Sequence, residues 1–194
     1  MERMSEKEKM MAGHLYQPYD QELYHEREIC KRMLYEYNRY TPVQKEEKDI
    51  LLKKLMNCKG ELCIEPPFYC QYGYHITVGL NFYSDVNLTI LDQGLVEIGD
   101  HVVFGPHVQI YTASYPFHEG QRMQGLEYTR PVKIYDHVWI GGNVTILPGV
   151  KINQGAIIGA GSVVTHDIPP YVIATGNPCR VLRSITKEDL HKQW

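Results

Sequence analysis

The sequence predicts a mainly β protein whose central part is a β-helix built from six-residue repeats. An aliphatic residue opens each of six consecutive hexapeptides, and a small or β-branched residue follows four positions later in every one. A period of six matches neither the 3.6-residue turn of an α-helix nor the alternation of a strand. It is typical of a β-helix, in which each hexapeptide forms one short strand and one corner. The opening residues are Ile134, Ile140, Ile146, Ile152, Ile158 and Val164.

Three hexapeptides make one coil, so side chains eighteen positions apart are predicted to stack. Each coil buries its apolar side chains only against the coils on either side, and several coils are therefore needed for stability. The predicted stacked pairs are Ile134 with Ile152, Ile140 with Ile158, and Ile146 with Val164.

Residues 1–60 have a different, helical character, because they are charged and poor in glycine. Ser5 and Glu8 have the spacing of a capping box, in which each side chain satisfies the other's backbone donor. This pair predicts a short helix that ends near Ala12.

Two longer helices are predicted to follow. Asp20 is a suitable N-cap for a helix that runs to Tyr37. Thr41 and Pro42 favour the start of a third helix, which ends before Gly60. The expected inward-facing residues are Leu23, Ile29, Met33, Leu34 and Tyr37 in the second helix and Ile50, Leu51 and Leu55 in the third.

The β-helix is expected over residues 61–170. Its repeat is less regular at first, shifts phase near Asp92 and resumes at Ile98. The repeat is interrupted over residues 111–131 by a polar stretch containing Pro116 and two glycines, which cannot fit the coil and is predicted to project from it. Long loops on a rigid scaffold often carry function.

Residues 171–194 are expected to form a C-terminal cap. A short helix is predicted from Thr186 to Gln193, where it would cover the open end of the β-helix. Such covering is common, because the end of a repeat array offers unpaired strand edges.

Composition excludes several classes of protein. The chain has 194 residues, 43% hydrophobic composition and a formal net charge of −3, which argues against a dedicated nucleic-acid surface. No apolar run approaches the roughly 18 residues of a membrane span, and the N-terminus lacks the apolar region of a secretory signal. We expect a cytoplasmic protein with no nucleic-acid or membrane partner.

Five cysteines without metal-type spacing are predicted to be free thiols: Cys30, Cys58, Cys63, Cys70 and Cys179.

Several short motifs accompany the repeat and the helical N-terminus, and the closing run of residues 176–180 reads Gly-Asn-Pro-Cys-Arg. The motifs are Ala12-Gly13, Leu34-Tyr-Glu-Tyr-Asn38, Glu65-Pro-Pro67, Asn81-Phe-Tyr83, Trp139-Ile-Gly141 and Gly159-Ala-Gly-Ser162. With these motifs the chain resembles the galactoside and maltose O-acetyltransferases, from its start to about Ser184.

The resemblance implies a left-handed parallel β-helix that assembles as a homotrimer. It also implies acetyl-coenzyme A as co-substrate, lying between neighbouring subunits, and transfer of the acetyl group to a hydroxyl of a sugar or related acceptor. No metal is implied. This chemistry needs a base for the hydroxyl proton and a donor for the oxyanion of the tetrahedral intermediate.

The resemblance assigns two sets of binding residues. Arg180 and Arg183 match positions that meet the phosphates of the coenzyme, for which arginine is suited. The full coenzyme set is Gly142, Ala160, Thr165, His166, Arg180 and Arg183. The acceptor set is Gln71, Asp85 and Gln93, with Asp20 and Arg27 from the helical segment.

The chain departs from the family pattern at the catalytic position. Tyr115 stands where the family has a histidine base immediately before a proline, Asp85 replaces an asparagine, and Gln93 replaces an acidic residue. A phenol with a pKa near 10 would need a neighbouring cation to act as a base at neutral pH. His118, three residues on, has a suitable pKa and is either the substitute base or a solvated loop histidine. Asp85 either acts with it, as a base or an orienting group, or caps a turn.

Two functions from different classes therefore remain open. The chain is either an acetyltransferase with Tyr115, Asp85 and His118 as its catalytic candidates, or a coenzyme-binding or scaffold protein that has lost turnover. A third hypothesis is a metal hydratase of the same fold, in which three histidines bind zinc. Each of these histidines lies three positions after a residue that opens a hexapeptide. Those histidines are His101, His107 and His137.

Overall fold

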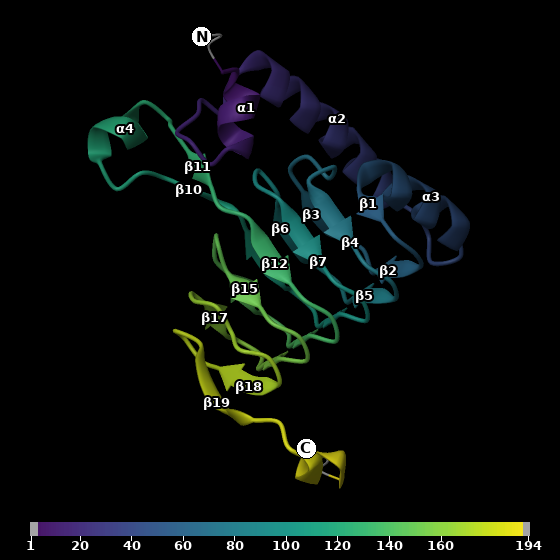
Figure 1. The fold of residues 1–194 in the computed structure, drawn as a ribbon. Helices are drawn as coiled ribbons and strands as arrows, with labels where there is room; N and C mark the ends of the chain where they lie inside the picture. Colours follow the sequence, from purple (N-terminus) through teal and green to yellow (C-terminus); the bar gives the residue numbers. More distant parts are fainter. Residues whose placement is uncertain (1–3, 192–194) are drawn as a thin grey trace.

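The computed structural model describes residues 4–191. A β-helix runs through most of the chain, with three helices across its N-terminal end and a β-hairpin at the other end (Figure 1). The parallel β-helix predicted from the hexapeptides is confirmed.

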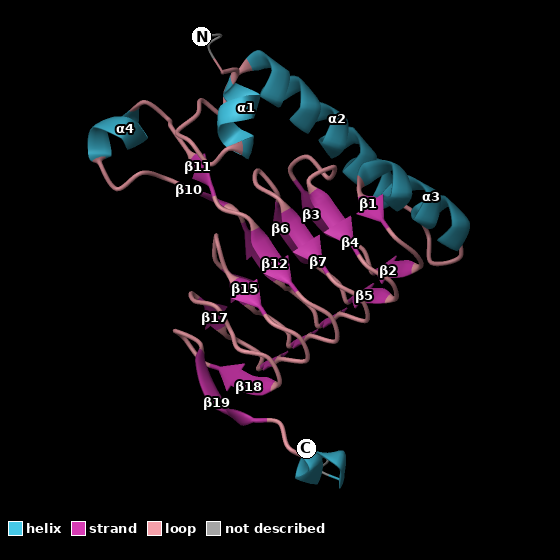
Figure 2. Ribbon diagram, viewed as in Figure 1, coloured by secondary structure: helices cyan, strands magenta, loops and turns pink. Residues whose placement is uncertain are grey.

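The coil has three parallel sheets, one on each face (Figure 2). The first sheet contains β1 (Asn57–Cys58), β4 (Ile76–Val78), β7 (Val96–Ile98), β12 (Val132–Ile134) and β15 (Lys151–Ile152). The second contains β2 (Leu62–Ile64), β5 (Phe82–Ser84), β8 (Val103–Phe104), β13 (Trp139–Ile140), β16 (Ile157–Ile158) and β18 (Val172–Thr175), with β19 (Arg180–Ser184) antiparallel at its edge. The third contains β3 (Phe68–Cys70), β6 (Leu88–Leu91), β9 (Gln109–Tyr111), β14 (Thr145–Ile146) and β17 (Val163–Val164).

The predicted stacking is present in the strand registers. Ile134 pairs with Ile152, Ile140 with Ile158, and Ile146 with Val164, and all six side chains are buried. The same columns continue through the earlier coils, but there the partners are twenty positions apart, as in the pairing of Ile76 with Val96. The earlier coils therefore have longer corners, which explains why their repeat is less regular in the sequence.

The N-terminal helices are α1 (Glu6–Met11), α2 (Gln21–Tyr37) and α3 (Lys45–Leu55). The predicted caps of the first two are confirmed, since Ser5 and Glu8 form the capping box and Asp20 accepts hydrogen bonds from two backbone amides. The predicted start of the third helix at Thr41 is wrong. Residues 41–44 form a turn instead, in which the amide and hydroxyl of Thr41 both donate to the side chain of Gln44.

Two predicted inward residues of these helices face solvent. Ile29 is 46% exposed and Ile50 is 55% exposed, whereas Cys30 and Leu52 are buried in their place. The reason is the helical spacing: the buried residues 23, 30, 34 and 37 of α2 lie three, four or seven positions apart and share one face, which position 29 does not join.

The interruption of the repeat leaves the coil as a projecting arm (Figure 1). Its stem is the antiparallel pair β10 (Ala113–Ser114) and β11 (Tyr128–Thr129), and its tip carries α4 (Glu119–Met123). The stem packs beside the N-terminal segment, because Tyr16 and Glu127 exchange backbone hydrogen bonds of 2.9 and 3.1 Å. The arm is thus anchored at its base.

The C-terminal prediction is only partly right. A short 3-10 helix, η1 (Lys187–His191), lies in the predicted segment, whose last residues fall outside the described range. It buries no side chain, and Leu190 is 78% exposed, so it does not cover the coil. In Figure 1 it lies beyond the β18–β19 hairpin, which closes the sheet edge instead. No helix among residues 4–191 is long and apolar enough to cross a membrane.

We predict that Ile140→Ala lowers the free energy of unfolding by about 2–5 kcal/mol, because it removes most of a buried side chain from the middle of a stacked column. Ile140 is fully buried between its register partners Phe104 and Ile158. Urea denaturation checks this, with Lys151→Ala on an exposed strand position as the control, for which a change of about 0.5 kcal/mol or less is expected. Equal effects of the two variants would contradict the stacking account.

Candidate functional site

A small polar pocket lies where the N-terminal segment, the coil and the base of the arm meet. Its volume is about 150 Å³, and three predicted acceptor residues, Arg27, Gln71 and Gln93, lie in its wall. The complete lining is Tyr16, Pro18, Tyr19, Arg27, Gln71, Gln93 and Glu127.

Asp92 holds the coil side of this pocket in place. Its buried carboxylate accepts hydrogen bonds from the amides of Gln71 (2.8 Å), Tyr72 (3.0 Å) and Gly73 (2.7 Å). Burial raises the pKa of Asp92, while these three backbone donors act in the opposite direction. Because Asp92 directly precedes Gln93, one carboxylate fixes the corners that present both glutamines to the pocket.

The Arg27 side chain joins α2 to the rest of the pocket. Its guanidinium donates to the Tyr72 hydroxyl at 2.7 Å and to the Pro18 carbonyl at 2.6 Å. Burial raises the pKa of Tyr72 to about 12, although the charge of Arg27 and its hydrogen bond both act to lower it. The guanidinium is therefore fixed in direction and keeps further N–H donors, of which it has five in all.

Gln93 contributes an acceptor that the protein does not satisfy. Its Oε1 atom is buried and has no hydrogen-bond partner among the described residues. A buried polar atom without a partner costs free energy, and a bound ligand that donates a hydrogen bond there removes the cost.

Glu127 and Tyr16 are pocket residues that the sequence motifs did not indicate. The Tyr16 hydroxyl donates to a carboxylate oxygen of Glu127 at 2.8 Å. Burial and the Glu127 charge both raise the pKa of Tyr16, so this phenol stays protonated and keeps donating. A carboxylate offers about four acceptor sites, which leaves Glu127 able to accept from a ligand as well. Their positions depend on the pairing of the arm with the N-terminal segment, for which the sequence carries no short-range signal.

Tyr115 lies at the start of the arm, with its side chain 58% exposed. The charge of Glu127 is the main cause of a raised Tyr115 pKa, with burial and hydrogen bonding to the same carboxylate adding to it. A base at this position would need a cation beside the phenol, and an anion lies there instead. At neutral pH the Tyr115 phenol is therefore protonated.

The other predicted catalytic residues do not line the pocket. Asp85 is half-buried in a corner of the coil and accepts a hydrogen bond from the Val86 amide at 2.8 Å, which is a turn-capping contact. His118 is exposed and directly precedes α4. Within residues 4–191 no hydrogen bond joins these two side chains. Asp20, predicted in the acceptor set, is the N-cap of α2 and does not line the pocket.

The predicted coenzyme residues follow successive strands toward the C-terminal end of the coil. Gly142 and Ala160 lie in corners after β13 and β16. A side chain at Gly142 would meet Pro106 of the preceding coil at 3.2 Å, so its small size also serves the packing of the coils.

Thr165 and His166 lie after β17, at a corner that follows a different sheet, and share a 2.8 Å hydrogen bond. Arg180 and Arg183 are on the exposed strand β19. Arg183 forms a two-bond ion pair with Asp189, at 2.7 and 2.8 Å. The charge of Arg183 is thus partly neutralised within the chain.

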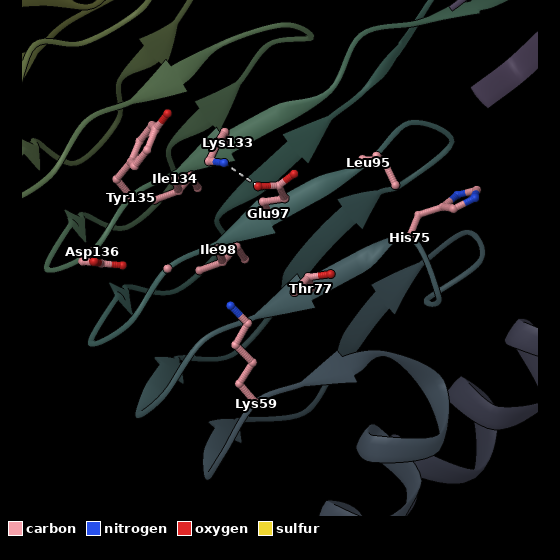
Figure 3. Close-up of a pocket in the computed structure, with 11 residues that line it drawn as sticks. Lys59, His75, Thr77, Leu95, Glu97, Ile98, Lys133, Ile134, Tyr135 and Asp136 are labelled. Atoms are coloured by element: carbon pink, nitrogen blue, oxygen red, sulfur yellow. Dashed lines mark ion pairs between the residues drawn. The ribbon is translucent and has the colours of Figure 1, made fainter. Parts of the chain in front are cut away.

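A larger groove of about 490 Å³ runs over the outer face of the first sheet (Figure 3). Within it, Glu97 of β7 and Lys133 of the adjacent strand β12 form an ion pair at 2.6 Å. Its lining includes none of the predicted site residues, and we do not place the active site there.

The three histidines of the zinc hypothesis do not gather into a metal site. The rings of His101 and His137 stack at 5.1 Å, and His107 lies 3.4 Å from the amide nitrogen of Asn87. In the described part of the chain, no group of three or more histidine, cysteine or acidic side chains could hold a metal ion. The metal hydratase hypothesis gains no support.

A coil of hexapeptides, a helical cap and a polar pocket beside a projecting arm are together typical of a hexapeptide-repeat transferase. A family model described as the maltose acetyltransferase hexapeptide capping motif matches residues 9–60, and one described as bacterial transferase hexapeptide (six repeats) matches residues 131–166. The galactoside O-acetyltransferase of Escherichia coli strain K12 is 42% identical over 95% of this chain and 91% of its own length.

Two solved structures of acetyltransferases have the same fold as this chain. A maltose O-acetyltransferase from Clostridium difficile 630 superimposes with a TM-score of 0.94 at 45% identity, covering 96% of this chain and 100% of that one. A galactoside acetyltransferase in complex with coenzyme A gives a TM-score of 0.92 at 39% identity, covering 99% and 96%. The chain belongs to the galactoside and maltose O-acetyltransferase family, which confirms the resemblance seen in the motifs.

We predict that Tyr115 ionises at a higher pH than an ordinary tyrosine, because deprotonation would place a second negative charge beside Glu127. Glu127→Gln removes that charge and is expected to lower the Tyr115 pKa toward the reference value of about 10. Titration of tyrosine-labelled protein by NMR, with Tyr115→Phe to assign the signal, checks this. An unchanged pKa in Glu127→Gln would mean that the carboxylate does not act on the phenol.

Proposed function

We propose that the protein transfers an acetyl group from acetyl-coenzyme A to a hydroxyl of a sugar or related acceptor. The observation that carries the proposal is the pocket itself, whose wall contains Arg27, Gln71 and Gln93, the last with its Oε1 atom buried and without a partner. A neutral polyhydroxylated molecule suits these groups, since each hydroxyl both donates and accepts. The named activities of the relatives support the same assignment.

The coenzyme is proposed to lie along the coil, past Gly142 and Ala160. These small residues leave the backbone accessible, and Arg180 and Arg183 would meet the phosphates. Arg183 would exchange its contact with Asp189 for the phosphate. The solved complex of a relative with coenzyme A supports the binding of this co-substrate.

A homotrimer is proposed from the outer face of the second sheet. Its strand registers align a column of apolar side chains that point away from the coil. In this column Tyr83 is 39% exposed, Val103 40% and Trp139 44%. Burial against a neighbouring subunit would remove this column from water. The family resemblance also implies that the arm reaches onto the next subunit of such a trimer.

A cytoplasmic location is proposed from the thiols, because all five cysteines are free, as expected in a reducing compartment. The net charge of −3 gives no support to a nucleic-acid partner. No observation indicates a membrane partner.

The second candidate function is a coenzyme-binding protein without turnover. It is favoured by Tyr115, which occupies the histidine's position with its pKa raised. Both functions require coenzyme binding, and only one requires chemistry.

We predict release of free thiol from acetyl-coenzyme A when a panel of sugars is added to the protein as it stands. Tyr115→His, alone and with Asp85→Asn, restores the family residues and is expected to support turnover as well, because it supplies a histidine that can act as general base. Turnover only in the restored variants would support the second function. Absence of coenzyme binding by calorimetry would contradict both.

We predict further that Gln93→Met raises the KM for the acceptor by up to roughly tenfold, because one hydrogen bond contributes about 0.5–1.5 kcal/mol. The value of kcat should change little if the contact is equally strong in the ground and transition states. Gln154→Met, at an exposed corner of the coil, is the matched control. An unchanged acceptor KM in Gln93→Met would place the acceptor elsewhere.

A further inference from the structure

Glu127 occupies a chemically unusual place in the pocket. Among the seven lining residues it alone carries a carboxylate. Glutamines and an arginine cannot take up a proton at neutral pH, and phenols with pKa values near 10 or above are already protonated. In this pocket wall, the Glu127 carboxylate is therefore the group that can take up a proton released by a hydroxyl of the bound substrate.

Two phenols lie beside that carboxylate. Tyr16 donates to one of its oxygens from the N-terminal side at 2.8 Å, and Tyr115 lies beside it from the arm. Tyr115 stands at the position where the family has its histidine. The carboxylate of Glu127 thus lies beside the position that the histidine occupies in the family.

From this arrangement we infer that Glu127 is the general base of the acetyl transfer, with Tyr115 and Tyr16 as positioning residues that donate to its carboxylate. The inference rests on the proposed function. It also assigns a role to the family departure at Tyr115, because a phenol is a suitable hydrogen-bond donor to a carboxylate, whereas it is a poor base.

The proton balance of the step is complete. A Glu127 oxygen takes the proton of the acceptor hydroxyl as that hydroxyl oxygen forms a bond to the thioester carbonyl carbon. The tetrahedral intermediate then collapses, the carbon–sulfur bond breaks, and the proton passes from Glu127 to the departing sulfur. The products are the acetyl ester and coenzyme A with a free thiol, and the carboxylate is regenerated.

The pH dependence separates this base from a histidine. Carboxyl and imidazole side chains have reference pKa values of about 4.3 and about 6.5, so the acid limb of kcat/KM for a carboxylate base lies about two units lower. The titratable and charged groups that face Glu127 are Tyr16, Tyr19, Arg27 and Tyr115. Tyr16 and Tyr115, whose pKa values are both raised, remain protonated across that limb.

The test is a pH–rate profile of thiol release for the full-length protein, Glu127→Gln and Tyr115→His, with the sugar that gives turnover. Glu127→Gln keeps an oxygen that accepts from Tyr16, so the fold and coenzyme binding by calorimetry should persist while kcat falls about 10²-fold or more. Glu119→Gln, an exposed acidic residue on the same arm, is the matched control and should retain the original rate. Tyr115→His should move the acid limb toward that of imidazole.

Two outcomes would overturn the inference while leaving the proposed function intact. One is turnover in Glu127→Gln within a few-fold of the original, and the other is an original acid limb near 6.5 that is lost in His118→Ala. Failure of every sugar to release thiol from the original protein is a different result. It would remove the proposed function and this inference with it.

Discussion

The stacking of one coil on the next is the constraint on which the rest of the molecule depends. Each hexapeptide buries its aliphatic side chain only when the neighbouring coils are present, so the columns through Ile140 and Ile146 require an uninterrupted register. Residues 112–131 leave this register and return to it without disturbing the columns, since Ile110 still pairs with Ile146. The arm is thus a large insertion that the stacked core tolerates.

The pocket forms where this tolerated insertion meets the capped end of the coil. The coil contributes two glutamines through the Asp92 corner, α2 contributes Arg27, and the arm contributes Glu127. No one of these three parts forms this pocket by itself. The backbone pairing of Tyr16 with Glu127 is what brings the arm to the other two.

The sequence predicted the parts of the molecule that depend on local pattern. The six-residue period predicted the coil and its stacked pairs, and the caps Ser5 and Asp20 predicted where two helices begin. The start of α3 was missed because the Thr41–Gln44 turn satisfies the same groups that a cap would.

The site was predicted in part. Arg27, Gln71 and Gln93 were indicated by the family resemblance and do lie together. Asp20 and Asp85 were indicated as well, but their side-chain oxygens accept from backbone amides, of α2 for Asp20 and of its own corner for Asp85. Glu127 was missed because its place in the pocket depends on a contact between residues 111 positions apart, which no short motif encodes.

The most direct test of this account is a crystal structure of the protein with coenzyme A and the acceptor that gives turnover. We expect the acceptor in the pocket, with one hydroxyl about 2.6–3.2 Å from the Glu127 carboxylate, the range in which a base can take its proton. The Gln93 Oε1 atom should accept from a second hydroxyl. An acceptor held by His118 and Asp85, with Glu127 bonded only to Tyr16, would contradict the account.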